Sequence, residues 1–249
     1  MANQKTVDVS TFRTIGILGG MGPEATVRLF ERIIALTPAK RDQEHLPILI
    51  CNLPQIPDRT AAIQGRGESP VPAASKGLQI LAAGGADFIA VPCNTIHHYF
   101  HELQAAVNIP ILHLIAEVQC TAAQRWPNLR RLGLLATDGT LQSGVYQKFF
   151  AAAGCEIIFP EPFRQQEIMS CIYAIKAGEK RFREALAAGR DLLERRAQGI
   201  ILGCTELSLV KNFLANDLPI IDSIEVLAQA CVDIARGVRE VPKQQIVIC

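Results

Sequence analysis

The 249-residue sequence lacks several features that mark particular classes of protein. Its longest apolar stretch, residues 103–116, is too short to span a bilayer and is interrupted by Asn108, Pro110 and His113. The segment before Thr14 has no apolar core typical of a secretory signal. Lys and Arg number 25 against 24 Asp and Glu, and no basic block stands out. We therefore expect a cytoplasmic protein that binds neither membrane nor nucleic acid.

Eight cysteines are present, but none of them forms a C-x-x-C pair. This absence excludes a zinc-finger framework and argues against a small scaffold held by disulfides. Each cysteine stands alone in an apolar neighbourhood, which indicates reduced thiols in a reducing compartment. His45 and His113 have no partner at a spacing typical of metal ligands, so we expect no metal site.

Short apolar runs alternate with amphipathic segments along the chain. Four runs predict buried strands: residues 14–20, 47–53, 87–92 and 110–115. Pro23 suits the first position of a helix, where its missing N–H has no partner to lose. Apolar residues after it are predicted to share one helix face: Val27, Phe30, Ile33 and Ile34. Strands that alternate with helices indicate an α/β protein with parallel sheets.

The second half of the chain repeats the pattern of the first. Residues 13–26 resemble residues 130–144, and each is a strand that turns through glycine into a helix. Residues 86–98 resemble residues 197–209, and each is a strand that ends in a cysteine. We predict two similar parallel-sheet α/β domains related by pseudo-twofold symmetry, with the active site in the cleft between them.

The domain boundary is expected near residues 116–128, where Trp-Pro-Asn breaks the pattern. Residues 1–116 together with 223–249 form the predicted N-terminal domain, and residues 117–222 form the second. The final helix, residues 223–236, is expected to return and pack on the first half.

Cys93 and Cys204 occupy equivalent places in the two repeats, at the carboxyl ends of predicted strands. Ligands of parallel sheets bind at these ends, and a helix that starts there lowers the pKa of a thiol. A pseudo-twofold relation points both thiols at one carbon atom. One thiolate can then remove a proton while the other thiol delivers one, which is a two-base racemisation or epimerisation. The alternative is an ordinary buried cysteine, which is our interpretation of the other six.

Two basic residues are candidates for binding a carboxylate. Arg59 follows the second predicted strand. It either binds a carboxylate through two hydrogen bonds or is a solvated loop arginine. Lys176 either shares this role or stabilises a helix C-terminus. His97 and His98 are interpreted as ordinary helix residues, with a Cys–His pair as the alternative. Glu206 is interpreted as a first-turn acid that stabilises its helix.

The glycine turn at residues 20–25 fits the G-x-G-x-x-A pattern of dinucleotide sites. The acidic residue expected after the second strand is missing, because Asp42 and Glu44 precede that strand. We therefore predict no dinucleotide cofactor, although the turn can still bind a carboxylate through its N–H groups.

Six motifs resemble those of the aspartate/glutamate racemase family, and most closely its aspartate racemase branch: GILGGMGPEAT, IPDRT, PCNT-x-H, GLLAT-x-GT, IKAG and GCTEL. They occur in the family order between about Thr14 and Asp222. The resemblance implies a cofactor-independent amino-acid racemase with one catalytic cysteine in each of two α/β domains, and Cys93 and Cys204 match these cysteines. Family members are commonly dimers, so a homodimer is expected.

The resemblance also implies which residues bind the substrate. Arg59 and Lys176 match the basic pair that holds the side-chain carboxylate of aspartate. Further substrate-binding positions match Met21, Asn94, Thr95, Thr137 and Thr205. The second cysteine motif reads GCTE where glutamate racemases typically carry GCTH, which favours aspartate over glutamate.

The expected function is therefore pyridoxal-independent racemisation of an acidic amino acid, aspartate first, by 1,1-proton transfer between the two cysteines. The alternatives are a glutamate or broader-specificity racemase of the same family, and a non-catalytic protein that binds an amino acid or carboxylate. The presence of both cysteines argues against the non-catalytic alternative and against the related decarboxylases, which keep only one. A thiol-redox enzyme is disfavoured by the missing C-x-x-C spacing.

Overall fold

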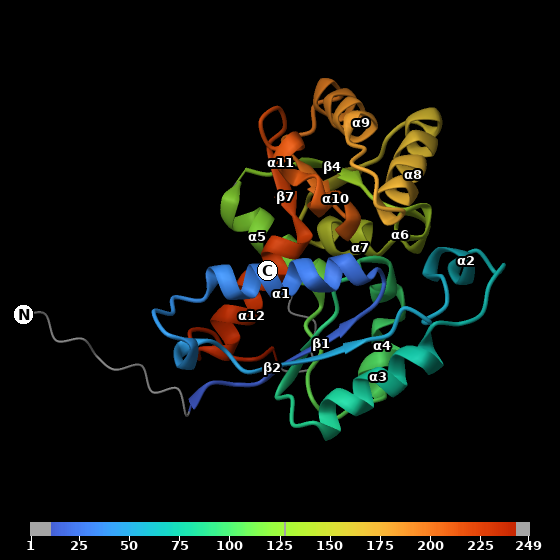
Figure 1. Cartoon of the computed structure of the whole chain (residues 1–249). Helices are drawn as coiled ribbons and strands as arrows, with labels where there is room; N and C mark the ends of the chain where they lie inside the picture. Colours follow the sequence, from blue (N-terminus) through green and yellow to red (C-terminus); the bar gives the residue numbers. More distant parts are fainter. Residues whose placement is uncertain (1–10, 127, 243–249) are drawn as a thin grey trace, which may run out of the picture.

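The protein, seen here in a computed structural model that describes residues 11–126 and 128–242, contains two parallel sheets (Figure 1). The strand order is β2-β1-β3 in the first sheet and β5-β4-β6-β7 in the second. The strands are β1 (Ile15–Gly19), β2 (Ile48–Asn52), β3 (Phe88–Ala90), β4 (Arg131–Leu135), β5 (Glu156–Ile158), β6 (Ile200–Leu202) and β7 (Ile220–Asp222). The prediction of an α/β fold with two parallel sheets is confirmed.

Helices connect the strands and cover both sheets. They are α1 (Pro23–Leu36), α2 (Arg59–Ile63), α3 (Val71–Ala83), α4 (Phe100–Ala105), α5 (Leu114–Arg125), α6 (Asp138–Ser143), α7 (Val145–Ala152), α8 (Pro162–Lys176), α9 (Arg183–Glu194), α10 (Thr205–Leu209), α11 (Lys211–Leu214) and α12 (Ser223–Ala235), with 3-10 turns η2 (Asp42–Glu44) and η3 (Thr95–Tyr99). No helix in the described part of the chain is long and apolar enough to cross a membrane.

The C-terminal helix α12 packs against α1 and α5, as the sequence predicts. The backbone N–H of Arg13 donates to the Ala235 carbonyl oxygen at 3.0 Å, and Arg32 forms an ion pair with Glu225 at 2.7 Å. The boundary predicted between residues 116 and 117 falls inside α5, so a continuous helix joins the two halves. The division into 1–116 with 223–249 and 117–222 remains a prediction.

Equivalent residues pair in the same register in the two sheets. In the first sheet Gly16 pairs with Ile89, and in the second Gly133 pairs with Ile200. The residues four positions after these two isoleucines are Cys93 and Cys204. Both cysteines therefore follow equivalent strands, at the carboxyl edge where parallel sheets bind ligands.

The predicted strand at residues 110–115 is mostly wrong. Only an isolated bridge between Ile89 and Ile111 continues the first sheet, and α5 already begins at Leu114. The cause is a pair of histidines that bind the first backbone N–H groups of the helix. His113 Nδ1 accepts from Ala116 N at 3.4 Å, and His97 Nε2 accepts from the Leu114 N–H at 3.1 Å. Helix capping thus outweighs the apolar strand pattern.

The predicted apolar face of α1 is also largely wrong. Its buried residues are Ala25, Thr26, Leu29 and Ile33, so only the last belongs to the predicted face. Val27, Phe30 and Ile34 are 66%, 37% and 41% exposed. Packing against α12 and β1 therefore covers a different face of the helix from the predicted one.

Six cysteines in the described part of the chain are free: Cys51, Cys93, Cys155, Cys171, Cys204 and Cys231. Cys120 is disulfide-bonded, so the expectation of reduced thiols is wrong at that position. Burial raises the pKa of the Cys155 and Cys171 thiols to about 11, which makes them unreactive near neutral pH. Both agree with their interpretation as buried small residues.

The two capping histidines predict acid sensitivity. Burial lowers the pKa of His97, and burial together with nearby His97 lowers that of His113 to about 2. Below pH 6.5 the unfolded chain therefore binds protons that the folded chain does not. The free energy of unfolding should fall on acidification, by on the order of 1 kcal/mol per pH unit for each histidine.

Urea denaturation at pH 7 and pH 5 measures this effect. His113→Asn keeps a side chain that can cap a helix but cannot titrate, so the loss of stability on acidification should be smaller than in the wild type. His98→Asn is the matched control, because His98 is exposed and should leave the acid-induced loss unchanged. An equal loss in wild type and His113→Asn would contradict the prediction.

Candidate functional site

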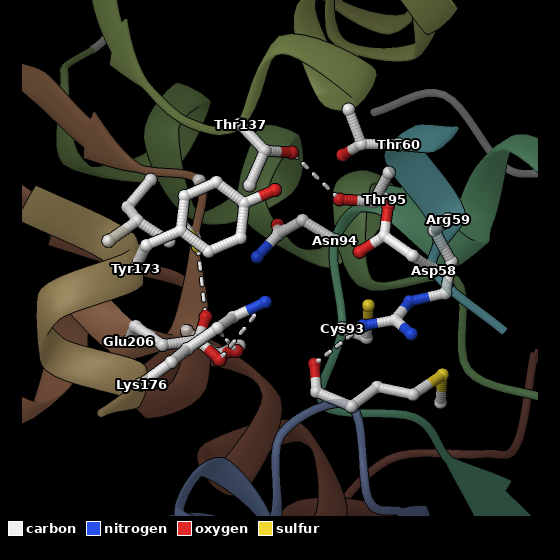
Figure 2. Close-up of a pocket in the computed structure, with 15 residues that line it drawn as sticks. Asp58, Arg59, Thr60, Cys93, Asn94, Thr95, Thr137, Tyr173, Lys176 and Glu206 are labelled. Carbon is white, nitrogen blue, oxygen red and sulfur yellow. Dashed lines mark hydrogen bonds and ion pairs between the residues drawn. The ribbon is translucent and has the colours of Figure 1, made fainter. Parts of the chain in front are cut away.

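One small pocket lies between the two halves and is lined by both of them (Figure 2). It brings together all nine residues predicted to be catalytic or to bind the substrate: Met21, Arg59, Cys93, Asn94, Thr95, Thr137, Lys176, Cys204 and Thr205. Six further lining residues were not assigned to a site by the sequence: Asp58, Thr60, Ile172, Tyr173, Gly203 and Glu206. The nine predicted residues therefore line one pocket, and the roles predicted for them remain predictions.

Cys93 lies in the short loop between β3 and η3, and its backbone is held on both sides. Its N–H donates to the Val91 carbonyl oxygen at 2.8 Å. His97 Nδ1, whose ring partner Nε2 accepts from Leu114, donates to the Cys93 carbonyl oxygen at 2.8 Å. His97 therefore orients the backbone of the loop rather than activating the thiol, which argues against a Cys–His pair.

Asn94 is fixed by two buried side chains from the second half and α12. Its Oδ1 accepts from the Tyr146 hydroxyl at 2.6 Å, and its Nδ2 donates to Ser223 Oγ at 3.1 Å. Ser223 in turn donates to the Leu202 carbonyl oxygen at 2.8 Å. This chain of hydrogen bonds locks the amide orientation and leaves the second Nδ2 hydrogen of Asn94 available to a ligand.

Three threonine hydroxyls join the halves at one wall of the pocket. Thr95 Oγ1 lies 3.0 Å from Thr137 Oγ1 and 2.8 Å from Thr140 Oγ1. Thr137 caps α6 by accepting from the Thr140 N–H at 3.3 Å. Gly139 allows the close approach of this helix, because a β-carbon there would lie 2.6 Å from Thr60 Oγ1. The hydroxyls are therefore rigidly placed beside the pocket.

The glycine turn after β1 presents Met21 to the pocket. Gly20 has φ +98°, and a β-carbon there would lie 2.3 Å from the Leu53 backbone, so only glycine fits. The Gly20 N–H donates to Thr26 Oγ1 at 3.0 Å, and Thr26 also bonds Asn52 Oδ1 at 3.0 Å. Thr26 occupies this N–H, so Gly20 contributes no donor to the carboxylate site that the sequence suggested for the turn.

Arg59 is buried rather than solvated, which excludes the loop-arginine alternative. It opens α2 with 9% of its surface exposed. Nη1 donates to the carbonyl oxygens of Ile56 and Pro57 at 3.2 and 3.0 Å, and Nη2 makes a long bond of 3.5 Å to Met21 O. Its buried Nε finds no acceptor among the described residues. An unsatisfied cationic donor at a pocket wall is suited to an anionic ligand.

Buried Cys204 and Glu206 form a cluster on the opposite wall with Lys176, whose side chain is 29% exposed. Cys204 Sγ donates to Glu206 Oε2 at 2.9 Å, and Lys176 Nζ lies 3.9 Å from Glu206 Oε1. Figure 2 shows Lys176 and Arg59 reaching toward the pocket from opposite sides, with Asn94 between them. Tyr173 continues the Lys176 wall, with its ring 5.7 Å from Nζ.

Burial and the charges within this cluster shift the pKa values of Cys204 and Lys176. Burial raises the pKa of the Cys204 thiol well above its usual range, and the Glu206 carboxylate adds to the effect, while Lys176 opposes it. The expectation of a lowered pKa at a helix N-terminus is therefore wrong for Cys204. Helix α10 has only five residues, and the carboxylate lies in contact with the sulfur. For Lys176 burial lowers the pKa, but Glu206 and Cys204 raise it more, so the ammonium stays charged.

The sequence missed the partners that arrive from distant segments. Tyr146 and Ser223 carry no motif, and their roles depend on tertiary contacts to Asn94. Glu206 could have been found, because it stands two residues after Cys204 in the GCTE motif. Within the described residues, no group of three or more His, Cys, Asp or Glu side chains is arranged to hold a metal ion.

Comparison with known proteins assigns the chain to a family. The Asp/Glu/hydantoin racemase family model matches residues 18–231. The protein belongs to this family of racemases, which are isomerases.

Individual relatives cover nearly the whole chain. It is 34% identical over 227 residues to the broad-specificity amino-acid racemase RacX of Bacillus subtilis (strain 168), covering 88% of this chain and 96% of the relative. The solved structure of Picrophilus torridus aspartate racemase superposes with a TM-score of 0.78 at 30% identity, covering 90% and 94% of the two chains. A glutamate racemase from Francisella tularensis shares the fold, with a TM-score of 0.67 at 19% identity over 95% and 86%.

Proposed function

We propose that the protein is a cofactor-independent racemase of an acidic amino acid, with aspartate as its substrate. The observation that carries this proposal is the convergence of Cys93 and Cys204 on one pocket from equivalent register positions of two sheets. The similarity to a Picrophilus torridus aspartate racemase, which spans most of both chains, supports the same choice of substrate.

The proposed reaction is a two-base proton transfer at the α-carbon. The thiolate of one cysteine forms an S–H bond as the α-C–H bond breaks, and the electron pair moves into the substrate carboxylate. The thiol of the other cysteine then delivers its proton to the opposite face, so the new C–H bond has inverted configuration. The reverse reaction exchanges the roles of the two cysteines, so it needs no group other than the two sulfurs.

The developing negative charge needs fixed donors. Asn94 offers the Nδ2 hydrogen not used by Ser223, and its amide cannot rotate because Tyr146 holds the oxygen. The hydroxyls of Thr95, Thr137 and Thr205 line the same pocket. We assign these groups to the α-carboxylate. The free Asn94 N–H stabilises the enediolate-like charge without reorganisation, and the hydroxyls turn their O–H groups toward it from their present partners.

The side-chain carboxylate is assigned to Arg59 and Lys176. The Arg59 Nε–H lacks an acceptor in the part of the chain that the structure describes, and Lys176 carries its charge on the opposite wall. Two cations held by the protein can bind a second carboxylate and thereby place the α-carbon between the two sulfurs.

Deuterium incorporation tests the proposed function directly. Each L-amino acid is incubated with the purified protein in D₂O without added cofactor, and α-deuterium and the D-enantiomer are measured by NMR and chiral chromatography. Aspartate should gain deuterium and racemise fastest. A protein that only binds amino acids, or a redox enzyme, would incorporate no label, and that result would overturn the proposal.

A broad-specificity racemase is the second candidate, and one observation favours it. Lys176 is paired with Glu206 at 3.9 Å, which reduces the positive charge offered to a distal carboxylate. The 34% identity to the Bacillus subtilis broad-specificity enzyme points the same way. In the D₂O panel this candidate predicts comparable labelling of several uncharged amino acids.

We also propose that two copies form a homodimer through the uncovered side of α1 and the edge strand β2. Phe30, Ile34 and Ile48 line a groove there, and Ile50 on the same strand is 44% exposed. An edge strand with exposed apolar neighbours is suited to pairing with its own copy around a twofold axis.

The proposed location of the protein is the cytoplasm.

Light scattering after size exclusion tests the dimer. The wild type should have about twice the chain mass of 27.2 kDa, and Phe30→Glu should reduce it to that of one chain. Val238→Glu is the control, because Val238 is 70% exposed but lies outside α1 and β2. A wild type that elutes as one chain, or a Phe30→Glu variant that stays dimeric, would contradict this interface.

A further inference from the structure

Glu206 is a buried carboxylate that the proposed two-base reaction leaves without a task. Only 4% of the residue is exposed. Its Oε2 accepts from Cys204 Sγ at 2.9 Å and from the Thr205 hydroxyl at 3.4 Å, and its Oε1 faces Lys176 Nζ at 3.9 Å. Burying a carboxylate is costly, so one kept in contact with a cysteine of the pocket calls for an explanation.

The two cysteines differ in the hydrogen bonds of their thiols. The Cys93 thiol makes no hydrogen bond to any described residue, and only its backbone is held, by Val91 and His97. The Cys204 thiol donates to a carboxylate two residues further along the chain. The pseudo-twofold symmetry of the pocket is therefore broken at the groups that exchange protons.

The charges around Cys204 decide where its proton stays. Burial and the Glu206 carboxylate disfavour the thiolate, since a second negative charge would lie in contact with the first. Lys176 acts in the opposite sense, and its effect on the pKa of Cys204 is smaller than that of Glu206. Three titratable groups interact electrostatically with Cys204: Tyr146, Lys176 and Glu206. The other titratable side chains that line the pocket are Asp58, Arg59, Cys93 and Tyr173.

Two-base racemisation requires one thiol and one thiolate at the same time. Without a nearby fixed charge the single proton could rest on either sulfur, and the enzyme would be divided between two forms. A carboxylate beside one sulfur removes this ambiguity, because it binds the thiol and repels the thiolate.

We propose that Glu206 is a positioning residue that holds Cys204 as the proton-donating thiol of the resting enzyme and thereby leaves the base role to Cys93. This inference rests on the proposed racemase function and adds an order to the two cysteines. Glu206 acts through Cys204 and does not itself touch the reacting carbon.

Single-cysteine variants separate the two sulfurs. In Cys93→Ala only Cys204 can remove an α-proton, and in Cys204→Ala only Cys93 can. Each variant is expected to exchange the α-hydrogen of only one enantiomer of aspartate in D₂O. The rate of this exchange is measured from pH 6 to pH 10. Glu206→Gln is then added to each variant.

In the Cys93→Ala background, Glu206→Gln should move the rise of the exchange rate to lower pH. At neutral pH the rate should therefore increase, by up to about tenfold for each pH unit of this movement. In the Cys204→Ala background the profile should stay in place. An unmoved profile in the first background, or equal movement in both, would overturn the proposal.

Alkylation gives a readout that does not need turnover. The rate at which iodoacetamide modifies Cys204 is followed against pH by mass spectrometry of its peptide, with Cys93 in the same samples as an internal reference. Glu206→Gln should lower the midpoint for Cys204 alone, and an unchanged midpoint would overturn the proposal. If the wild type exchanges no amino acid, the proposed function fails, and alkylation still decides the role of Glu206.

Glu117→Gln controls for the loss of a buried carboxylate in general. Glu117 is 8% exposed and pairs with Arg239 at 2.8 Å, so its removal also leaves a charged partner unpaired. It should destabilise the fold to a similar extent without moving either the Cys204 alkylation midpoint or the exchange profile. A midpoint that moves equally in Glu117→Gln would show that lost stability, rather than the local carboxylate, causes the effect.

Discussion

Replacing either Cys93 or Cys204 by alanine is expected to lower the racemisation rate by about 10⁴-fold. In the proposed reaction each sulfur performs one of the two proton transfers. Both residues are only 5% exposed, so bulk water has little access to replace a missing sulfur. Serine at either position should be nearly as poor, because a hydroxyl is far harder to ionise than a thiol.

The measurement is D-aspartate formed from L-aspartate, followed by chiral chromatography. Cys171→Ala is the matched control, since Cys171 is a fully buried free thiol that does not line the pocket. It should cost stability, as other core truncations do, but keep turnover. Full turnover by either Cys93→Ala or Cys204→Ala would exclude the two-base reaction, whereas retained α-exchange with one enantiomer only would support it.

The sequence predicted the positions of the cysteines well because they depend on local and repeated patterns. Gly16 and Gly133 mark the same register position in their sheets, and each cysteine stands at a fixed distance beyond the paired strand residue. Strand, glycine turn and cysteine are all encoded within short segments. A duplicated pattern of this kind predicts a shared pocket without knowledge of any distant contact.

The electrostatics of the pocket could not be predicted in this way. A helix N-terminus suggested an easily ionised thiol at Cys204, but the structure surrounds it with protein and adds the Glu206 carboxylate. The face of α1 was misjudged for a related reason. Val27 and Phe30 fit an apolar helical pattern, yet the packing of α12 decides which face is covered. Such outcomes depend on neighbours from distant parts of the chain.

Arg59→Ala should lower kcat/KM for aspartate by about 100-fold, the second large effect expected at the site. Hydrogen bonds to charged groups contribute about 1.5–3 kcal/mol each, and two bonds to one carboxylate account for a loss of this size. The Nε–H has no acceptor among the described residues, and the Nη2 bond to Met21 O is long at 3.5 Å, so this edge of the guanidinium can bind both carboxylate oxygens. Arg59→Lys should recover little, because an ammonium lacks the planar fork.

Kinetics with aspartate and with the best uncharged substrate of the D₂O panel distinguish recognition of the side chain from a structural role. Arg59 also donates to the carbonyl oxygens of Ile56 and Pro57, so its loss should weaken α2 for every substrate alike. Recognition of the distal carboxylate predicts a loss that is large for aspartate and small for the uncharged substrate. The control is Arg66→Ala, which removes a nearby exposed arginine outside the pocket. Equal losses for both substrates would mean that Arg59 shapes the loop, and that the distal carboxylate is bound elsewhere.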